Sequence, residues 1–164
     1  MHRILKVVHL IGRALFLGSV FSHVVASVVG GPPGSPGFLP ARAEIVAATR
    51  ALTLPGLGLA VLSGLGMAIV SPGFRRQRWF WLHAALAGLV VASSLAWVAP
   101  AGRRALALAT SGEGAADLAS ALLIERVAGS VNIALAIALL VVGVIRPALR
   151  ARIGASNVER RIRS

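Results

Sequence analysis

The chain of 164 residues contains no cysteine, so disulfide bonds, thiolate metal sites, iron–sulfur clusters and cysteine nucleophiles are all excluded. Acidic residues are scarce as well, because five Asp and Glu stand against 17 Lys and Arg, for a formal net charge of +12. Charged residues make up only 13% of the chain and hydrophobic residues 57%. A soluble domain has about 25% charged and about 45–50% apolar residues. The composition therefore excludes an ordinary water-soluble domain and favours a protein embedded in a membrane.

The strong positive charge raises the question of nucleic-acid binding, which depends on basic residues gathered along one surface. Here the basic residues form short clusters between long apolar runs. That distribution is typical of a polytopic membrane protein. We therefore predict membrane lipids as partners and no nucleic acid.

Four apolar runs are long enough to cross a bilayer core, which takes about 20 helical residues. They lie at about 5–29, 51–70, 79–99 and 127–145. We predict an all-α fold, an antiparallel bundle of four transmembrane helices within residues 1–146, followed by a basic cytoplasmic tail at 147–164.

The segments between these runs differ in composition. Residues 30–40 are rich in glycine and proline and predict a loop, and residues 41–50 could extend the second helix outward. Residues 73–78 predict a tight hairpin and residues 101–120 a longer loop.

The distribution of basic residues predicts the orientation of the chain. Eleven of them lie on the side of the two termini and five on the opposite side, while Arg13 lies inside the first span. Because basic loops stay inside, we predict a bacterial inner-membrane protein with both termini in the cytoplasm. The length of the first apolar run and its poor cleavage site favour a retained helix over a signal peptide.

Titratable side chains within lipid are costly to bury and are therefore candidates for function. Apart from Lys6 at the edge of the first span, the spans contain four of them, namely His9, Arg13, His23 and His83, and one methionine, Met67. At 1.5 Å of rise per residue, His83 lies about 6 Å below the inner boundary, and His9 and Met67 lie at comparable depth. Arg13 follows His9 by one turn on the same face.

Two imidazoles from different helices at one depth are the ligand set of a bis-histidine haem b. We therefore predict His9 and His83 as axial ligands, with Arg13 paired to a haem propionate. Gly12 and Gly88 would leave room for the porphyrin.

A second haem would need a partner for His23, which shares a face with His9 about 21 Å further along the helix. The corresponding position of the third span is Trp97 rather than histidine. The sequence thus predicts one haem, near the cytoplasmic side.

Structural roles compete with these assignments. His23 stands among serines and could simply hydrogen-bond inside the bundle, and His9 and His83 could face water at the interface. Arg13 could extend to the inner headgroups. His9, His83 and Met67 together would suit copper, because imidazole and thioether are ligands for Cu(I).

Glu125 and Arg126 lie at the outer end of the fourth span, and we predict that they form an interfacial pair of little energetic weight.

Small residues recur at every fourth position in all four spans, a pattern that lets helices approach closely in a bilayer. The rows are Ala14, Gly18, Ser22 and Ala26; Gly56, Ala60, Gly64 and Ala68; Ala84, Gly88, Ala92 and Ala96; and Ser130, Ala134 and Ala138. We expect these rows to face neighbouring helices.

Three segments carry a resemblance to a known family: LKVVHLIGRALFLGSV at 5–20, TLPGLGLAVLSGLGMAI at 53–69, and LAWVAPAGRR at 95–104. With them the chain resembles an uncharacterised family of bacterial four-helix integral membrane proteins, distantly similar to copper-resistance protein D and to HemJ-like proteins. The resemblance implies an inner-membrane protein with a functional His9, and a link to copper passage or to haem and protoporphyrinogen oxidation. HemJ-like proteins also use a lysine in a later span, whereas Lys6 is the only lysine here.

Three functions follow as expectations. The first is a haem b-binding redox or haem-handling protein that exchanges electrons with quinone or a partner protein. The second is a non-catalytic accessory or scaffold subunit among other membrane subunits. Spans rich in small residues and without a carboxylate fit this role. The third is a copper-related membrane protein. The residues assign no enzymatic reaction.

Overall fold

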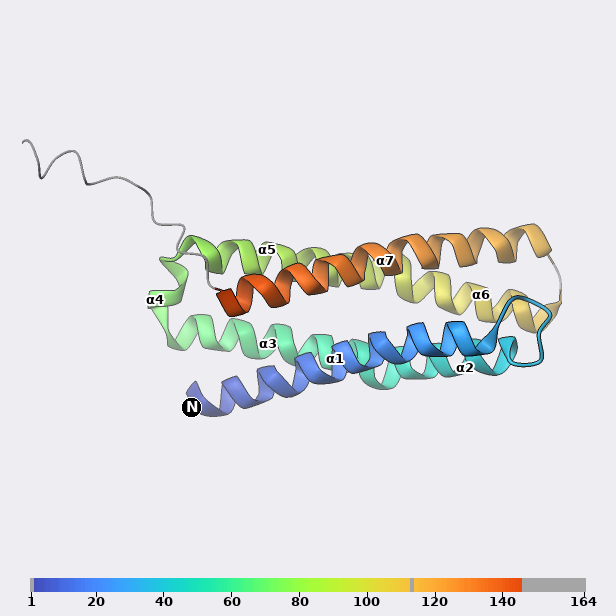
Figure 1. Ribbon diagram of the computed structural model, residues 1–164. Helices are drawn as coiled ribbons and strands as arrows, with labels where there is room; N and C mark the ends of the chain where they lie inside the picture. The colour runs from blue at the N-terminus through green and yellow to red at the C-terminus, as the bar shows by residue number, and fades with distance from the viewer. Residues whose placement is uncertain (1, 113, 146–164) are drawn as a thin grey trace, which may run out of the picture.

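The computed structural model describes residues 2–112 and 114–145, and all regular secondary structure in these two ranges is helical (Figure 1). The α-helices are α1 (His2–Gly30), α2 (Phe38–Ala48), α3 (Leu54–Val70), α4 (Pro72–Arg75), α5 (Arg78–Ser93), α6 (Ala99–Ser111) and α7 (Ala115–Ile145). Two π-helical segments, η1 (Thr49–Thr53) and η2 (Ser94–Val98), join α2 to α3 and α5 to α6.

Four continuous helices result, and each is long and apolar enough to cross a membrane. They are Arg3–Gly30, Phe38–Val70, Arg78–Ser111 and Ala115–Ile145. The prediction of four such helices is confirmed by their length and composition. Each helix contains its predicted span, and the last three extend well beyond it.

The extra length corrects the predicted loops. The prediction of a loop over residues 101–120 is wrong, because α6 continues to Ser111 and α7 begins at Ala115. The segment is polar on one face only: Ala101 and Ala105 are buried, while Arg103 and Arg104 are exposed. Gly112 ends α6 in the left-handed conformation, at φ 72°, which glycine adopts without strain.

The predicted loop at 30–40 is also shorter in the structure, where it covers residues 31–37 between α1 and α2. Residues 41–50 are helical, so the predicted outward extension of the second helix is confirmed. The predicted basic tail at 147–164 lies outside the described residues.

The helices form two hairpins. In the first hairpin (α1, α2, η1 and α3), α1 packs along α2 and α3, and in the second (α5, η2, α6 and α7), α7 packs along α5 and α6. The hairpins lie one above the other in Figure 1, and their main close approach is that of α2 to α6. Halfway along, one residue from each long helix forms the core: Phe16, Leu57, Val90 and Ala136.

Glycine determines how closely α1 lies on α3. A Cβ atom on Gly12 would lie 2.6 Å from the Ala60 nitrogen, and one on Gly56 would lie 2.8 Å from the Phe16 nitrogen. Only glycine allows backbones this close, which is how dispersion contacts between membrane helices are maximised. The row beginning at Gly56 therefore faces a neighbouring helix as predicted.

The other predicted rows do not face neighbours in this way. Added Cβ atoms on Gly18 and Gly88 would meet nothing within 4 Å, and Ala14, Ala84 and Ala134 are exposed. Alanine-rich helices carry several rows of small residues, so the spacing alone did not identify the packed one. The buried polar residues Ser19 and Asn132 mark the inward faces of α1 and α7 instead.

Candidate functional site

Two groups of polar side chains lie between the hairpins, on either side of the apolar core. The first, here called the histidine cluster, consists of His9, Arg13 and His83 and lies toward α4. The second surrounds a cavity near α2 and α6, here called the interhairpin cavity.

His9 is oriented by the helix on which α1 packs. Its Nδ1 donates to the Ala60 carbonyl oxygen at 2.8 Å and lies 3.3 Å from the Ser63 hydroxyl. A carbonyl can only accept, so Nδ1 must carry the proton, and Nε2 of the neutral ring keeps its lone pair. Gly64 lies against the ring, since a Cβ there would be 3.6 Å from Cε1. This is the orientation that a metal-ligating histidine needs.

His83 lies in a similar setting in the second hairpin. A Cβ on Gly143 of α7 would come within 3.2 Å of its Cε1, so the glycine makes room for the ring. Its Nδ1 is buried near the Leu139 carbonyl but makes no hydrogen bond with a described residue. His83 also lies within electrostatic range of both His9 and Arg13. The two histidines that sequence spacing placed at one depth therefore lie within electrostatic range of each other in the fold.

Arg13 is half-buried and lies within electrostatic range of both imidazoles. No hydrogen bond or ion pair joins its guanidinium to a residue in the described part of the chain. Its donors are thus free for an anionic group from outside the protein.

Other parts of the predicted haem site lie elsewhere. Gly12 cannot make room for a porphyrin, because its missing side chain is what lets α1 contact α3. That prediction is wrong, and Gly64 and Gly143 are the glycines beside the rings. Gly88 is exposed and is not in contact with His83. Met67 is half-buried one turn beyond Ser63 on α3, and no hydrogen bond among the described residues joins its side chain to either histidine.

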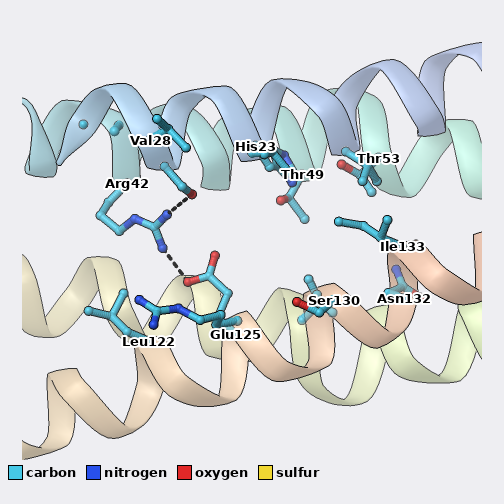
Figure 2. Close-up of a pocket in the computed structure, with 18 of the residues that line it drawn as sticks. His23, Val28, Arg42, Thr49, Thr53, Leu122, Glu125, Ser130, Asn132 and Ile133 are labelled. Atoms are coloured by element: carbon cyan, nitrogen blue, oxygen red, sulfur yellow. Dashed lines mark hydrogen bonds and ion pairs between the residues drawn. The ribbon is translucent and has the colours of Figure 1, made fainter. Parts of the chain in front are cut away.

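The interhairpin cavity has a volume of about 390 Å³ and is lined by both hairpins. Figure 2 shows His23, Thr49 and Thr53 on the side of the first hairpin, facing Ser130, Asn132 and Ile133 on the other. Cavities of this size are in the range of small-molecule sites.

A buried ion pair lines the cavity and ties the hairpins together. The Arg42 guanidinium of α2 donates to the Glu125 carboxylate of α7 and to the Ser27 hydroxyl at 3.0 Å (Figure 2). Arg42 is only 5% exposed. The prediction that Glu125 forms a surface pair with Arg126 is wrong, because its partner is 83 positions away in the other hairpin.

Further along the helices from this ion pair, the cavity is lined by Thr53, Ser94 and Asn132 (Figure 2). The Asn132 amide nitrogen donates to the Ser94 hydroxyl at 3.1 Å, while its Oδ1 is buried without a hydrogen-bond partner. Such an orphan acceptor is costly in a low-dielectric interior and calls for a ligand or an ordered water.

His23 lines the cavity and hydrogen-bonds with Ser19, its Nε2 lying 3.3 Å from the serine hydroxyl. Ser19 also lies 2.7 Å from the Thr53 hydroxyl, which links α1 to η1. A hydrogen bond inside the bundle was the structural alternative for His23, and the structure shows one, although the serine lies one turn away on the same helix and not on the next helix.

Both π-helical segments border the cavity, with Thr49 and Thr53 from η1 and Ser94 and Val98 from η2 in its lining. Each segment ends just before a helix with proline in its first turn, at Pro55 and Pro100. Proline has no N–H for the regular helical hydrogen bond, so the preceding turn can widen. Single π-turns are frequent at functional sites.

Sequence reasoning identified the histidine cluster but missed the cavity. Asn132 is a neutral residue within the fourth span, and Arg42 belongs to the five basic residues on the side opposite the termini, so neither stood out in the sequence. The paired Leu-Pro-Gly and Ala-Pro-Ala segments at 54–56 and 99–101 were the available local signal.

No protein-family model matches the chain, and neither a curated protein nor a solved structure matches it. The family resemblance therefore stays a prediction. Within the described ranges, no group of three or more His, Cys, Asp or Glu could hold a metal ion.

Proposed function

We propose that the protein is an antiparallel four-helix bundle of the bacterial inner membrane, with both termini in the cytoplasm. The four long apolar helices support membrane insertion. The excess of basic residues on the side of the termini supports the orientation. In this arrangement the histidine cluster lies in the inner half of the membrane and the interhairpin cavity in the outer half.

We further propose that His9 and His83 bind one haem b as axial ligands. The observation that carries this proposal is the hydrogen bond from His9 Nδ1 to Ala60, which leaves Nε2 available as a ligand. The glycines beside the two rings, Gly64 in the first hairpin and Gly143 in the second, support it. Two neutral imidazoles suit haem iron, and a bound haem would supply a one-electron couple.

Arg13 completes the proposed site. A haem carries two propionates, and the Arg13 guanidinium, which has no partner among the described residues, would pair with one of them in the same half of the membrane. Its charge would also favour the reduced haem, because reduction removes a positive charge from the iron. Arg13→Gln should therefore lower the midpoint potential of the bound haem.

An absorption spectrum of the protein, purified in detergent after expression with ample haem, tests the proposal. We expect a Soret band with the sharp reduced bands of a six-coordinate haem, and its loss or conversion to a five-coordinate form in His9→Ala and His83→Ala. His23→Ala is the matched control and should leave the spectrum unchanged. The absence of a Soret band, or a spectrum insensitive to His83→Ala, would contradict the proposal.

A further inference from the structure

The interhairpin cavity opens to the outside between α1 and α7. Val24 and Val28 of α1 and Arg126 and Ser130 of α7 line the cavity, and all four are exposed. These two helices make few close contacts with each other. In a bundle embedded in a membrane, a ligand would therefore enter sideways from the lipid.

Arg126 places an uncompensated positive charge at this opening. Its guanidinium forms no ion pair or hydrogen bond with a described residue, and neither does the hydroxyl of Ser130, one turn further on the same face of α7. The other two charges in the cavity lining compensate each other, because Arg42 is paired with Glu125. With His23 neutral, the lining has one surplus positive charge, which favours a ligand with one negative charge.

Two further arginines add to the positive potential at this end of the bundle. Arg50 and Arg103 line a small recess that shares His23 and Glu125 with the cavity lining. Neither arginine forms an ion pair within the part of the chain that the structure describes. Glu44, the other carboxylate within electrostatic range of His23, is exposed. The surplus of positive charge disfavours a cationic ligand and attracts an anionic one.

The depth of Arg126 matches that of lipid phosphates. It precedes Ile145, the last residue of α7, by 19 positions, a rise of about 28.5 Å along a regular helix. The hydrocarbon core of a bilayer is about 30 Å thick. With Ile145 at one boundary of the core, Arg126 therefore lies at the other, beside the phosphate groups.

From Arg126 the cavity extends toward the middle of the bundle, where its lining is apolar. Val20, Leu54 and Ile133 line this part and are partly buried, and Val20 also packs against the core halfway along the helices. The Oδ1 atom of Asn132 has less than 1 Å² of accessible surface and is out of a ligand's reach. The cavity thus joins a cationic opening to an interior suited to an apolar chain.

We propose that the interhairpin cavity binds one anionic glycerophospholipid, with its phosphodiester on Arg126 and Ser130 and one acyl chain inside. A phosphodiester carries a single negative charge, and a guanidinium is well suited to phosphate oxygens. The Ser130 hydroxyl donates a further hydrogen bond. The inference rests on the membrane location proposed above but not on the haem, because the cavity shares no residue with the histidine cluster.

Native mass spectrometry of the full chain in detergent, titrated with dioleoyl phosphatidylglycerol, tests the proposal. We expect saturable binding of one lipid per chain. Dioleoylglycerol lacks the phosphate, and glycerophosphoglycerol lacks the acyl chains. Each should bind about tenfold more weakly or less, because each occupies only part of the site. Equal affinity for glycerophosphoglycerol would indicate a site for a free phosphodiester and overturn the assignment to a lipid.

Replacing Arg126 tests the phosphate contact. Arg126→Gln should weaken phosphatidylglycerol binding about fivefold to tenfold, the effect of one basic residue close to an anionic lipid. Arg78→Gln is the matched control, because Arg78 is also exposed, has no ion pair among the described residues and lies at the opposite end of the bundle. Equal weakening in both variants would mean a general attraction between arginine and anionic lipid, and would overturn the proposal.

Gly129 offers a direct way to fill the cavity. It lines the cavity, and a Cβ added there would meet nothing within 4 Å, so Gly129→Leu places a side chain in open space. We expect about tenfold weaker lipid binding in this variant. Gly88→Leu should bind like the wild type, because Gly88 also meets nothing within 4 Å and lies outside the cavity lining.

Three further results would count against a bound lipid. They are the absence of saturable binding, equal affinity in wild type and Gly129→Leu, and a dimer that dissociates in Gly129→Leu, which would make a second copy of the chain the occupant. His83→Ala should keep wild-type lipid affinity, so failure of the haem proposal is distinguishable from failure of this one. Membrane fractionation separately tests the location on which both depend.

Discussion

Arg42 shows how one buried charge can connect two halves of a molecule. It reaches from α2 to Glu125 of α7, and its second amino group is occupied by Ser27 of α1. A buried ion pair contributes little relative to an apolar pair of the same volume, but leaving one charge without its partner is expensive. Within the described residues, this is the buried ion pair that joins the hairpins, so its energetic effect should exceed that of surface pairs.

Glu125→Ala should therefore destabilise the protein by about 3–5 kcal/mol, because it leaves the Arg42 guanidinium buried without a counter-charge. Reversible unfolding in mixed micelles with increasing SDS measures the change. Asp117→Ala is the control, since the Arg104–Asp117 pair is 62% and 61% exposed and should contribute at most about 1 kcal/mol. Equal losses in the two variants would show that the charge of Arg42 is compensated by water rather than by Glu125.

At the scale of residues, the sequence was enough to find candidate site residues that lie inside an apolar helical run. His9, Arg13 and His83 could be found because a titratable side chain inside an apolar run is itself a signal. Arg42 gave no such signal, because it lies outside the predicted 51–70 span and only the fold reveals that it is buried. Pairing between residues 83 positions apart depends on how the hairpins dock, which no local pattern encodes.

At the scale of elements, the contact between α1 and α3 rests on two glycines. Gly12 and Gly56 bring the backbones so close that even one methyl group on either would meet main-chain atoms at 2.6–2.8 Å. Main-chain atoms cannot move aside as a flexible side chain can. The two helices would have to separate along their shared length.

Gly12→Ala should cost about 1–3 kcal/mol of stability through this overpacking. Gly18→Ala, on the same helix, should be neutral or stabilise by up to about 1 kcal/mol, since its Cβ meets nothing within 4 Å and alanine is the better helix former. SDS-induced unfolding monitored by circular dichroism distinguishes the two. A smaller loss for Gly12→Ala than for Gly18→Ala would mean that α1 does not pack on α3 through this glycine.

The number of long helices could be predicted from composition, because 20 or so apolar residues in a row leave few alternatives. The ends of the helices could not be predicted in this way. Residues 101–111 are amphipathic, with one face packed against the protein and the other exposed, so the helix continues beyond the predicted apolar span. The π-helical segments were also missed. A proline such as Pro55 predicts a disturbed turn, but whether that turn kinks, breaks or widens depends on what packs beside it.

Across the whole molecule, the two polar sites are separated by an apolar layer. The core residues Phe16, Leu57, Val90 and Ala136 lie between the histidine cluster and the interhairpin cavity. Groups on the two sides therefore face different halves of the bilayer in the proposed orientation. Which half holds which site depends entirely on how the chain is inserted.

The proposed orientation depends strongly on the tail. Among the described residues, five basic side chains lie at the α4 end (Arg3, Lys6, Arg75, Arg76 and Arg78) and five at the opposite end (Arg42, Arg50, Arg103, Arg104 and Arg126). The excess inside comes from the six arginines at positions 146–163. Since the positive-inside rule acts on basic residues near the ends of the spans, the tail should decide the orientation.

The absence of cysteine makes this directly measurable, because any single introduced thiol is labelled without background. Ala116→Cys and Gly73→Cys place exposed thiols at opposite ends of the bundle without a change of charge. A membrane-impermeant maleimide on intact spheroplasts should label Ala116→Cys, and should label Gly73→Cys only after lysis. With the six tail arginines changed to glutamine, we expect partial labelling of both before lysis, because the charge bias is lost. Labelling of Gly73→Cys alone in the native chain would invert the assignment and place the histidine cluster on the outer side.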